Sequence, residues 1–305
     1  MYNKILVALD GSQLAESILP YARSLANALN ISVELLQVID PDTLIPSVAA
    51  QRGYSHALLT AEREHNGEYL KDIAASFSNP AAVSCSVRIG KPAEVIIEVA
   101  AARADTLIAM ATHGRSGVKR WLLGSVAEKV LHRANNDLLL VRAAEQVDSR
   151  KGALPKRILV PLDGSKLAEM ALSCAVALAK EMSLELVLLR VYLMPGIAYP
   201  PGSYAPDWEL LDKETRQGAS EYLQERMRQL KDDGLERVSL VVLEGSAAEK
   251  IVDLAREPPG TLIVMSTHGM SGMGRWVLGS IAERVARHSG EPVLIVRTTR
   301  ERSAS

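Results

Sequence analysis

The chain has 305 residues, about twice the ~150 of an ordinary domain, and 48% of them are hydrophobic, so we expect two globular cores. Its formal net charge is -1 at pH 7 and no basic block stands out, which excludes the broad cationic surface typical of nucleic-acid-binding proteins. The two cysteines, Cys85 and Cys174, are too few for a disulfide framework or a zinc cluster. Small ligands or other proteins, and no nucleic acid, are therefore the expected partners.

The first residues predict a strand and not a targeting segment. Residues 5–9, ILVAL, follow Lys4 directly, and no basic region leads into a long apolar stretch. No apolar run in the chain approaches the roughly 18 residues needed to span a bilayer. We expect a cytoplasmic protein that does not associate with a membrane.

An internal repeat relates the two halves of the chain. Residues 5–19, ILVALDGSQLAESIL, match residues 158–172, ILVPLDGSKLAEMAL, at 11 of 15 positions. Residues 106–130, TLIAMATHGRSGVKRWLLGSVAEKV, match residues 261–285, TLIVMSTHGMSGMGRWVLGSIAERV, at 17 of 25 positions. The offsets are 153 and 155 residues, so the second half duplicates the first.

The repeat predicts two domains of one kind. We expect a first domain over 1–143, a polar linker over 144–156, a second domain over 157–298 and a short tail over 299–305. In each half, short apolar runs alternate with longer amphipathic runs, the pattern of βαβ units.

The apolar runs are rich in Val, Ile and Leu, as in a parallel sheet covered by helices on both faces. The expected strands are 4–9, 33–38, 83–88, 106–111 and 137–142, then 157–162, 185–191, 237–243, 261–266 and 292–297. The expected helices are 13–29, 57–76, 92–102 and 125–134, then 166–182, 207–232, 247–256 and 280–289. The sequence therefore predicts two tandem α/β domains, each with a five-stranded parallel sheet.

The best-matched segments of the two copies meet at one place in such a fold. In a doubly wound sheet of order 3-2-1-4-5, the ligand crevice lies at the carboxyl ends of strands one and four. Strand one runs into 9–12, LDGS, and into 162–165, LDGS, in the second copy. Strand four runs into 110–114, MATHG, and into 265–269, MSTHG. We expect a binding site there in each copy.

A glycine-rich loop follows strand four and leads to the last helix. Glycines let backbone amides approach an anion, and a helix N-terminus adds unpaired N–H groups, so phosphate suits such a place. The loop glycines and the residues beside them are Gly114, Arg115, Gly117, Gly124 and Ser125, and Gly269, Gly272, Gly279 and Ser280 in the second copy.

This spacing, a glycine, nine residues and then Gly-Ser, resembles the ATP-binding motif of the universal stress protein family, Gly-x2-Gly-x9-Gly-Ser/Thr. The resemblance covers both halves and implies Rossmann-like domains of the adenine nucleotide alpha hydrolase type, with sheet order 3-2-1-4-5. The chain departs from the motif at its first glycine, which is Ala111 in one copy and Ser266 in the other. If the ligand needs a backbone angle that only glycine reaches, the extra Cβ weakens binding.

The resemblance also implies ATP with Mg²⁺ as the ligand. Asp10 and Asp163 would lie beside the nucleotide and bind Mg²⁺. The residues that would flank adenine are Val38, Met110, Val191 and Met265. Those that would hold the phosphates are Gly114, Gly124, Ser125 and Val126, with Gly269, Gly279, Ser280 and Ile281. Arg115 and Lys119 become Met270 and Gly274 in the second copy, so we expect the first site to bind ATP more tightly.

Structural alternatives stay open for the same residues. Ser125 precedes Glu128 by three positions, and Ser280 precedes Glu283, so each pair matches a capping box in which serine serves its own helix. Asp10, followed by Gly and Ser, is also typical of a turn before a helix.

Three kinds of function fit this pattern. The first is a stress-response nucleotide-binding protein that acts by regulated binding. The second is a slow Mg²⁺-dependent ATPase, although the chain has no Walker lysine motif and offers no evident residue to position water. The third is a scaffold that has lost nucleotide binding. Family members pair through their fifth strands, so residues 137–142 and 292–297 would meet within this chain, and a homodimer stays possible.

Overall fold

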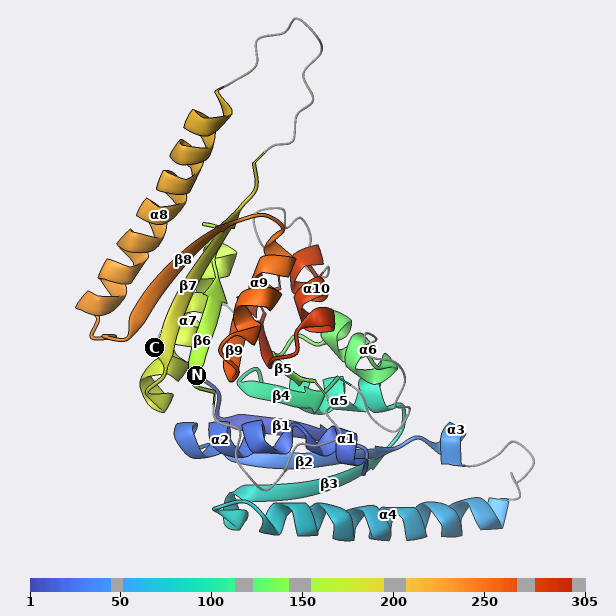
Figure 1. The fold of residues 1–305 in the computed structure, drawn as a ribbon. Coiled ribbons are helices and arrows are strands. Elements are labelled where there is room, and N and C mark those ends of the chain that lie inside the picture. Colours follow the sequence, from blue (N-terminus) through green and yellow to red (C-terminus); the bar gives the residue numbers. More distant parts are fainter. Residues whose placement is uncertain (45–51, 113–122, 143–154, 195–206, 268–277, 298–305) are drawn as a thin grey trace, which may run out of the picture. The chain divides into compact units, whose positions relative to one another are not determined.

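The structure is a computed structural model that describes residues 1–44, 52–112, 123–142, 155–194, 207–267 and 278–297 (Figure 1). The chain divides into two compact units, the first built mainly from Met1–Leu154 and the second mainly from Pro155–Met273 and Gly279–Val293. Most of the expected linker lies outside the described residues, so the domain boundaries stay a prediction. Among the described helices, none is long and apolar enough to cross a membrane.

The first half of the chain forms a parallel sheet of order β3-β2-β1-β4-β5. Its central strands β1 and β4 are apolar and almost wholly buried, as the continuous hydrophobic runs require. The expected strand order is therefore confirmed. The strands are β1 Lys4–Leu9, β2 Ser32–Ile39, β3 Val83–Ile89, β4 Thr106–Ala111 and β5 Leu138–Val141.

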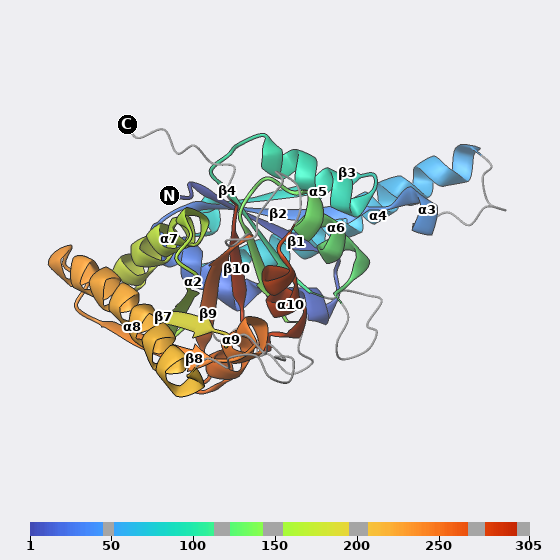
Figure 2. The ribbon, with the colours of Figure 1, turned by 90° about the horizontal axis from the view of Figure 1, so that it is seen from above.

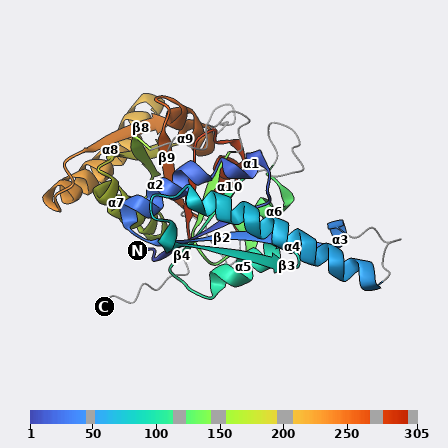
Figure 3. The same cartoon turned by 90° about the horizontal axis from the view of Figure 1, so that it is seen from below.

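Helices cover both faces of this sheet. α1, α2 and α4 lie on one face, where α4 packs against β2 and β3, and α5 and α6 lie on the other (Figures 2 and 3). The helices are α1 Gln13–Glu16, α2 Leu19–Leu29, α3 Pro41–Leu44, α4 Arg52–Ala75, α5 Pro92–Ala101 and α6 Ser125–Arg133, with a 3-10 turn at Pro80–Ala82.

The second half repeats the same arrangement, with strand order β10-β9-β6-β7-β8. α7 and α8 pack on β6, β7, β8 and β9, and α9 packs on β7 and β9 beside α10. The strands are β6 Arg157–Pro161, β7 Glu185–Tyr192, β8 Val238–Glu244, β9 Thr261–Ser266 and β10 Val293–Val296. The helices are α7 Lys166–Met182, α8 Trp208–Asp232, α9 Ala247–Arg256 and α10 Ser280–His288.

One expected helix, 13–29, is wrong as a single element. The chain forms α1 and then, after a break at Ser17 and Ile18, α2. Pro20 stands in the first turn of α2; it has no N–H to donate to the carbonyl four residues earlier, so the helix cannot continue through it. In the second copy Ser173 occupies the equivalent position, and α7 runs unbroken.

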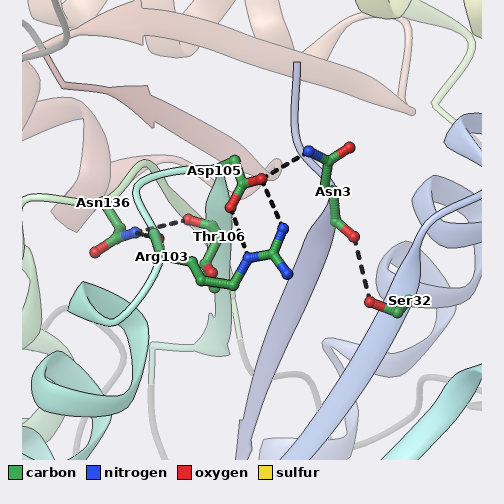
Figure 4. Close-up of polar contacts among 6 residues, drawn as sticks. All are labelled: Asn3, Ser32, Arg103, Asp105, Thr106 and Asn136. Carbon is green, nitrogen blue, oxygen red and sulfur yellow. Dashed lines mark hydrogen bonds and ion pairs between the residues drawn. The ribbon is translucent and has the colours of Figure 1, made fainter.

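A polar cluster ties the amino ends of β1, β2 and β4 together, at the end of the sheet opposite the expected crevice (Figure 4). Asn3 Nδ2 donates to the Asp105 carboxylate at 2.6 Å, and Arg103 reaches both oxygens of that carboxylate at 3.1 and 3.0 Å. The Ser32 hydroxyl donates to the Asn3 carbonyl at 3.2 Å, and Asn136 donates to the Arg103 carbonyl at 2.9 Å. The hydrogen bonds from Arg103, and then Asn3, hold the pKa of Asp105 well below its usual range.

Candidate functional site

A cavity of about 540 Å³ opens at the carboxyl ends of β1, β2 and β4. Every described residue that we assigned to the first site lines it: Asp10, Val38, Met110, Ala111, Gly124, Ser125 and Val126. This is the crevice where doubly wound sheets bind ligands, and its volume lies within the usual range of ligand pockets. Gly114, Arg115 and Gly117 lie outside the described residues.

A backbone hydrogen bond brings the helix and the strand of this site together. The Gly124 N–H donates to the Thr112 carbonyl at 2.7 Å, which places the start of α6 beside the end of β4. The second copy repeats the bond between the Gly279 N–H and the Thr267 carbonyl at 2.8 Å. The positive end of α6 and its unpaired N–H groups therefore lie at the cavity.

The first helical hydrogen bond of α6 shows that the capping-box hypothesis is wrong. α6 begins at Ser125 and its cap residue is Gly124, whose carbonyl accepts the first helical hydrogen bond from Glu128 at 2.8 Å. α10 likewise begins at Ser280 with Gly279 as its cap. Because each serine is already the first helical residue, its hydroxyl is not the side-chain cap of its helix.

Asp10 does form the turn that we considered as an alternative. Its Oδ1 accepts hydrogen bonds from the Ser12 N–H at 3.0 Å and from the Ser12 hydroxyl at 2.6 Å. Asp163 accepts the Ser165 N–H at 2.9 Å in the same way. Ser12 and Ser165 then cap α1 and α7 by accepting the N–H three residues on, at 3.2 and 3.1 Å. Asp10 therefore both accepts the hydrogen bonds of this turn and lines the cavity.

The missing first glycine of the motif imposes no backbone strain. Ala111 lies within β4 opposite Val141, and Ser266 ends β9. The non-glycine residues with positive φ in the described part of the chain are Asn30 and Ser183. Both motif positions therefore have ordinary strand backbone, which any residue adopts.

Two buried polar residues of the cavity wall escaped sequence analysis. Gln37 of β2 is 3% exposed and Asn66 of α4 is 4% exposed. Gln37 interrupts the apolar run 35–39 of β2, which was the available signal. Asn66 gave no such signal, because it lies on a long helix whose buried face only the packing defines.

Charged residues also line the cavity. Lys129 of α6 and Lys91, just before α5, supply cations, and Glu62 of α4 supplies an anion. Lys91 forms ion pairs with Asp42 and, at 3.4 Å, with Asp40. The pKa of Lys91 is raised, mainly by its hydrogen bond to Asp42.

The described residues fit Mg²⁺ as a companion of a nucleotide and not as an independently held ion. Within the described ranges, no three His, Cys, Asp or Glu side chains gather where they could hold a metal. Asp10 alone offers a carboxylate at the end of β1. One carboxylate with phosphate oxygens and water is a usual way for proteins to bind Mg²⁺.

In the second copy, the described candidate residues occupy the equivalent positions. Asp163 follows β6, and Val191 lies near the end of β7. Met265 and Ser266 end β9, Gly279 is the cap of α10, and Ser280 and Ile281 are its first residues. Ile281 is 44% exposed. Gly269 and Gly272 lie outside the described residues.

Each half thus has the doubly wound α/β architecture, in which a helix begins beside the ends of the first and fourth strands. The model of the universal stress protein family matches residues 1–142 and again residues 155–297. The chain belongs to this family, with two tandem copies of its domain.

Known relatives agree with this assignment. A universal stress protein of Mycolicibacterium smegmatis is 27% identical over 303 residues, covering 96% of each chain. One from Methanocaldococcus jannaschii is 33% identical over 145 residues, covering 47% of this chain and 83% of that one. The crystal structure of a universal stress protein from Archaeoglobus fulgidus has the same fold, with a TM-score of 0.67, 23% identity and coverage of 97% and 99%.

Proposed function

We propose that the protein binds adenine nucleotides, that the cavity of the first copy takes ATP with Mg²⁺, and that the protein acts through regulated binding. The observation that carries this proposal is the cavity itself. It joins an apolar wall, a carboxylate and a helix N-terminus at the point where the strand order reverses.

Each part of the cavity suits one part of the nucleotide. Val38 and Met110 offer apolar contact to a flat base. Gly124 and Ser125 stand where α6 begins, and its N–H groups and positive end favour phosphate. Lys129 adds a cation on the same helix. Asp10 would hold Mg²⁺ that bridges to the phosphates.

Calorimetry on the full chain tests this proposal. We expect ATP with Mg²⁺ to bind, and Asp10→Asn to weaken binding at the first site. Asn at this position keeps an oxygen that can accept the Ser12 hydrogen bonds, so the turn survives while the charge is lost. An unchanged melting temperature for Asp10→Asn would confirm that the fold is intact. Mass spectrometry of small molecules extracted from freshly purified protein provides an independent reading.

Other outcomes point to the two alternatives. No adenine compound in the extract and no ATP binding by calorimetry would favour a scaffold. Steady phosphate release, abolished by Asp10→Ala together with Asp163→Ala, would favour a slow ATPase.

We also propose that the two sites are unequal. Arg115 and Lys119 of the first copy are replaced by Met270 and Gly274, so the second copy has two fewer cations in the equivalent loop. Calorimetry of Asp10→Asn and Asp163→Asn chains, each keeping one intact site, compares the two affinities. Equal affinities would contradict this proposal.

Pairing of residues 137–142 with 292–297, a homodimer of the whole chain, and a cytoplasmic location stay predictions. Cysteine pairs placed in β5 and β10 test the pairing by disulfide formation. Light scattering after gel filtration measures the mass of the assembly. Cell fractionation tests the location.

A further inference from the structure

The two copies differ at one position next to the proposed adenine contact. Gln37 directly precedes Val38 in β2, and Arg190 directly precedes Val191 in β7. The repeat offset of 153 makes Gln37 and Arg190 equivalent, just as it makes Asp10 and Asp163 equivalent. A neutral amide in the first copy is therefore a cation in the second.

In the first copy this position is a polar part of the cavity wall. Gln37 is 3% exposed, and its Oε1 has no hydrogen-bond partner among the described residues. An unsatisfied buried carbonyl is costly, so Gln37 suits a ligand or water that donates to it. It brings no positive charge close to Asp10.

In the second copy the arginine reaches the turn that contains the candidate carboxylate. Arg190 Nη1 lies 2.8 Å from the point where a Cβ on Gly164 would be, and Gly164 follows Asp163 directly. Gly164 has φ of +85°, so both the backbone angle and the guanidinium favour glycine there. The guanidinium thus lies beside the turn from β6 into α7.

Neighbouring residues hold the guanidinium in this place. Its central carbon lies 4.8 Å from the centroid of the Tyr222 ring, a cation–π distance. Asn66 of the first copy is replaced by Ala219 at the same offset, which removes a polar side chain from this face of the helix. Glu169, which accepts a hydrogen bond from the Tyr222 hydroxyl at 3.2 Å, pairs with Arg226 at 2.9 Å.

We propose that Arg190 is the resident cation of the second site and takes the role there that Mg²⁺ would have in the first. A positive charge at the Asp163–Gly164 turn opposes a divalent cation at the Asp163 carboxylate. A guanidinium also suits phosphate oxygens directly. The second site therefore binds the metal-free nucleotide, whereas the first site, with neutral Gln37, requires the metal. This inference rests on the proposed nucleotide binding and deepens it.

Calorimetry with ATP on the full chain, in EDTA and in excess Mg²⁺, tests the inference. The Asp10→Asn chain reports on the second site, and the Arg190→Gln chain, which lacks the resident cation of the second site, reports on the first. We expect EDTA to weaken binding by at least tenfold in Arg190→Gln and to leave it within about threefold in Asp10→Asn, which is less than 1 kcal/mol. Melting temperatures with and without ATP provide a second reading.

Exchange of the two residues provides the matched variants. In the Asp10→Asn chain, Arg190→Gln should weaken ATP binding in EDTA by about tenfold or more, the size of one charge-assisted hydrogen bond. Arg190→Lys keeps the charge but loses the planar fork. In EDTA, its ATP affinity should therefore lie between those of the Asp10→Asn chains with arginine and with glutamine at position 190. In the Arg190→Gln chain, Gln37→Arg should make ATP binding less dependent on Mg²⁺.

The possible failures can be told apart. If ATP binds but both sites depend equally on Mg²⁺, or if Arg190→Gln leaves the metal dependence unchanged in a folded chain, Arg190 is only a structural partner of Tyr222. The inference is then wrong while the proposed function stands. If ATP binds to neither site in either buffer, the inference and the proposed function are both wrong.

Discussion

The Gly124 N–H donates to the Thr112 carbonyl at 2.7 Å, and Gly124 is the residue that precedes α6. This hydrogen bond joins the start of α6 to the end of β4. Ser125 is left as the first helical residue on the cavity wall. Its hydroxyl is available to a ligand and contributes no cap to the helix.

Ser125→Ala should accordingly separate binding from stability. We expect the free energy of unfolding to change by less than about 0.5 kcal/mol, as for a surface substitution, while ATP affinity falls. Ser165→Ala is the matched control, because Ser165 does cap α7 and its loss should cost about 1 kcal/mol. Urea unfolding and calorimetry measure the two effects. A loss of stability in Ser125→Ala as large as that in Ser165→Ala would restore the capping interpretation.

The break between α1 and α2 provides a second prediction. Ser173 of α7 is exposed and stands where the first copy has Pro20, so Ser173→Pro tests the backbone effect alone. We expect a loss of about 3 kcal/mol, because proline removes a helical hydrogen bond and clashes with the preceding turn. Ser173→Ala is the control and should be nearly neutral. Equal unfolding midpoints for the two variants would show that α7 tolerates the same break as the first copy.

These elements show what sequence patterns could and could not specify. The repeat and the apolar runs predicted β1, β4 and β9 at their observed bounds, because buried parallel strands require continuous hydrophobic residues. The break at Pro20 was readable but missed, since the helical pattern continues through it. The start of α6 at Ser125 was predicted correctly. The hydrogen bond from the Gly124 N–H to the Thr112 carbonyl was not readable, because it depends on how the two segments pack.

The residues of the site also divide into those that the sequence predicted and those that it did not. Local motifs identified Asp10, Ser125 and their equivalents, and the structure gathers the described members of the first set around one cavity. The burial of Asn66 in the cavity wall depends on how the long helix α4 packs. The position of Arg190 against Gly164 and Tyr222 depends on contacts between residues 26 and 32 positions apart, which no local pattern encodes.

Ala111→Gly should bring no gain in ATP affinity, although it restores the glycine of the family motif. Ala111 lies in strand backbone, so a glycine angle is not in use there. Glycine in a strand loses more conformational entropy on folding, and we expect a stability loss of about 0.5 to 1 kcal/mol. Calorimetry and urea unfolding measure both effects, with Ala109→Gly as a control in the same buried strand. A clear rise in affinity would mean that the Cβ of Ala111 obstructs the ligand.

The polar cluster at the amino ends of the strands predicts a pH dependence of stability. The pKa of Asp105 is held below its usual range, chiefly by Arg103 and then by Asn3, so the folded state favours the carboxylate. This stabilisation is complete above the unfolded pKa of about 4 and is lost as the pH falls below it, because the unfolded chain then binds the extra proton. Asp105→Asn should therefore destabilise the chain at pH 7 and cost progressively less between pH 5 and pH 3.

A double-mutant cycle with Arg103→Gln assigns the cause. In the Arg103→Gln background, Asp105→Asn should cost less at pH 7, and its pH dependence should flatten, because the main hydrogen-bond donor to the carboxylate is gone. Urea unfolding at several pH values measures all four chains. A cost of Asp105→Asn that stays constant from pH 7 to pH 3 would show that the carboxylate titrates alike in the folded and unfolded chains.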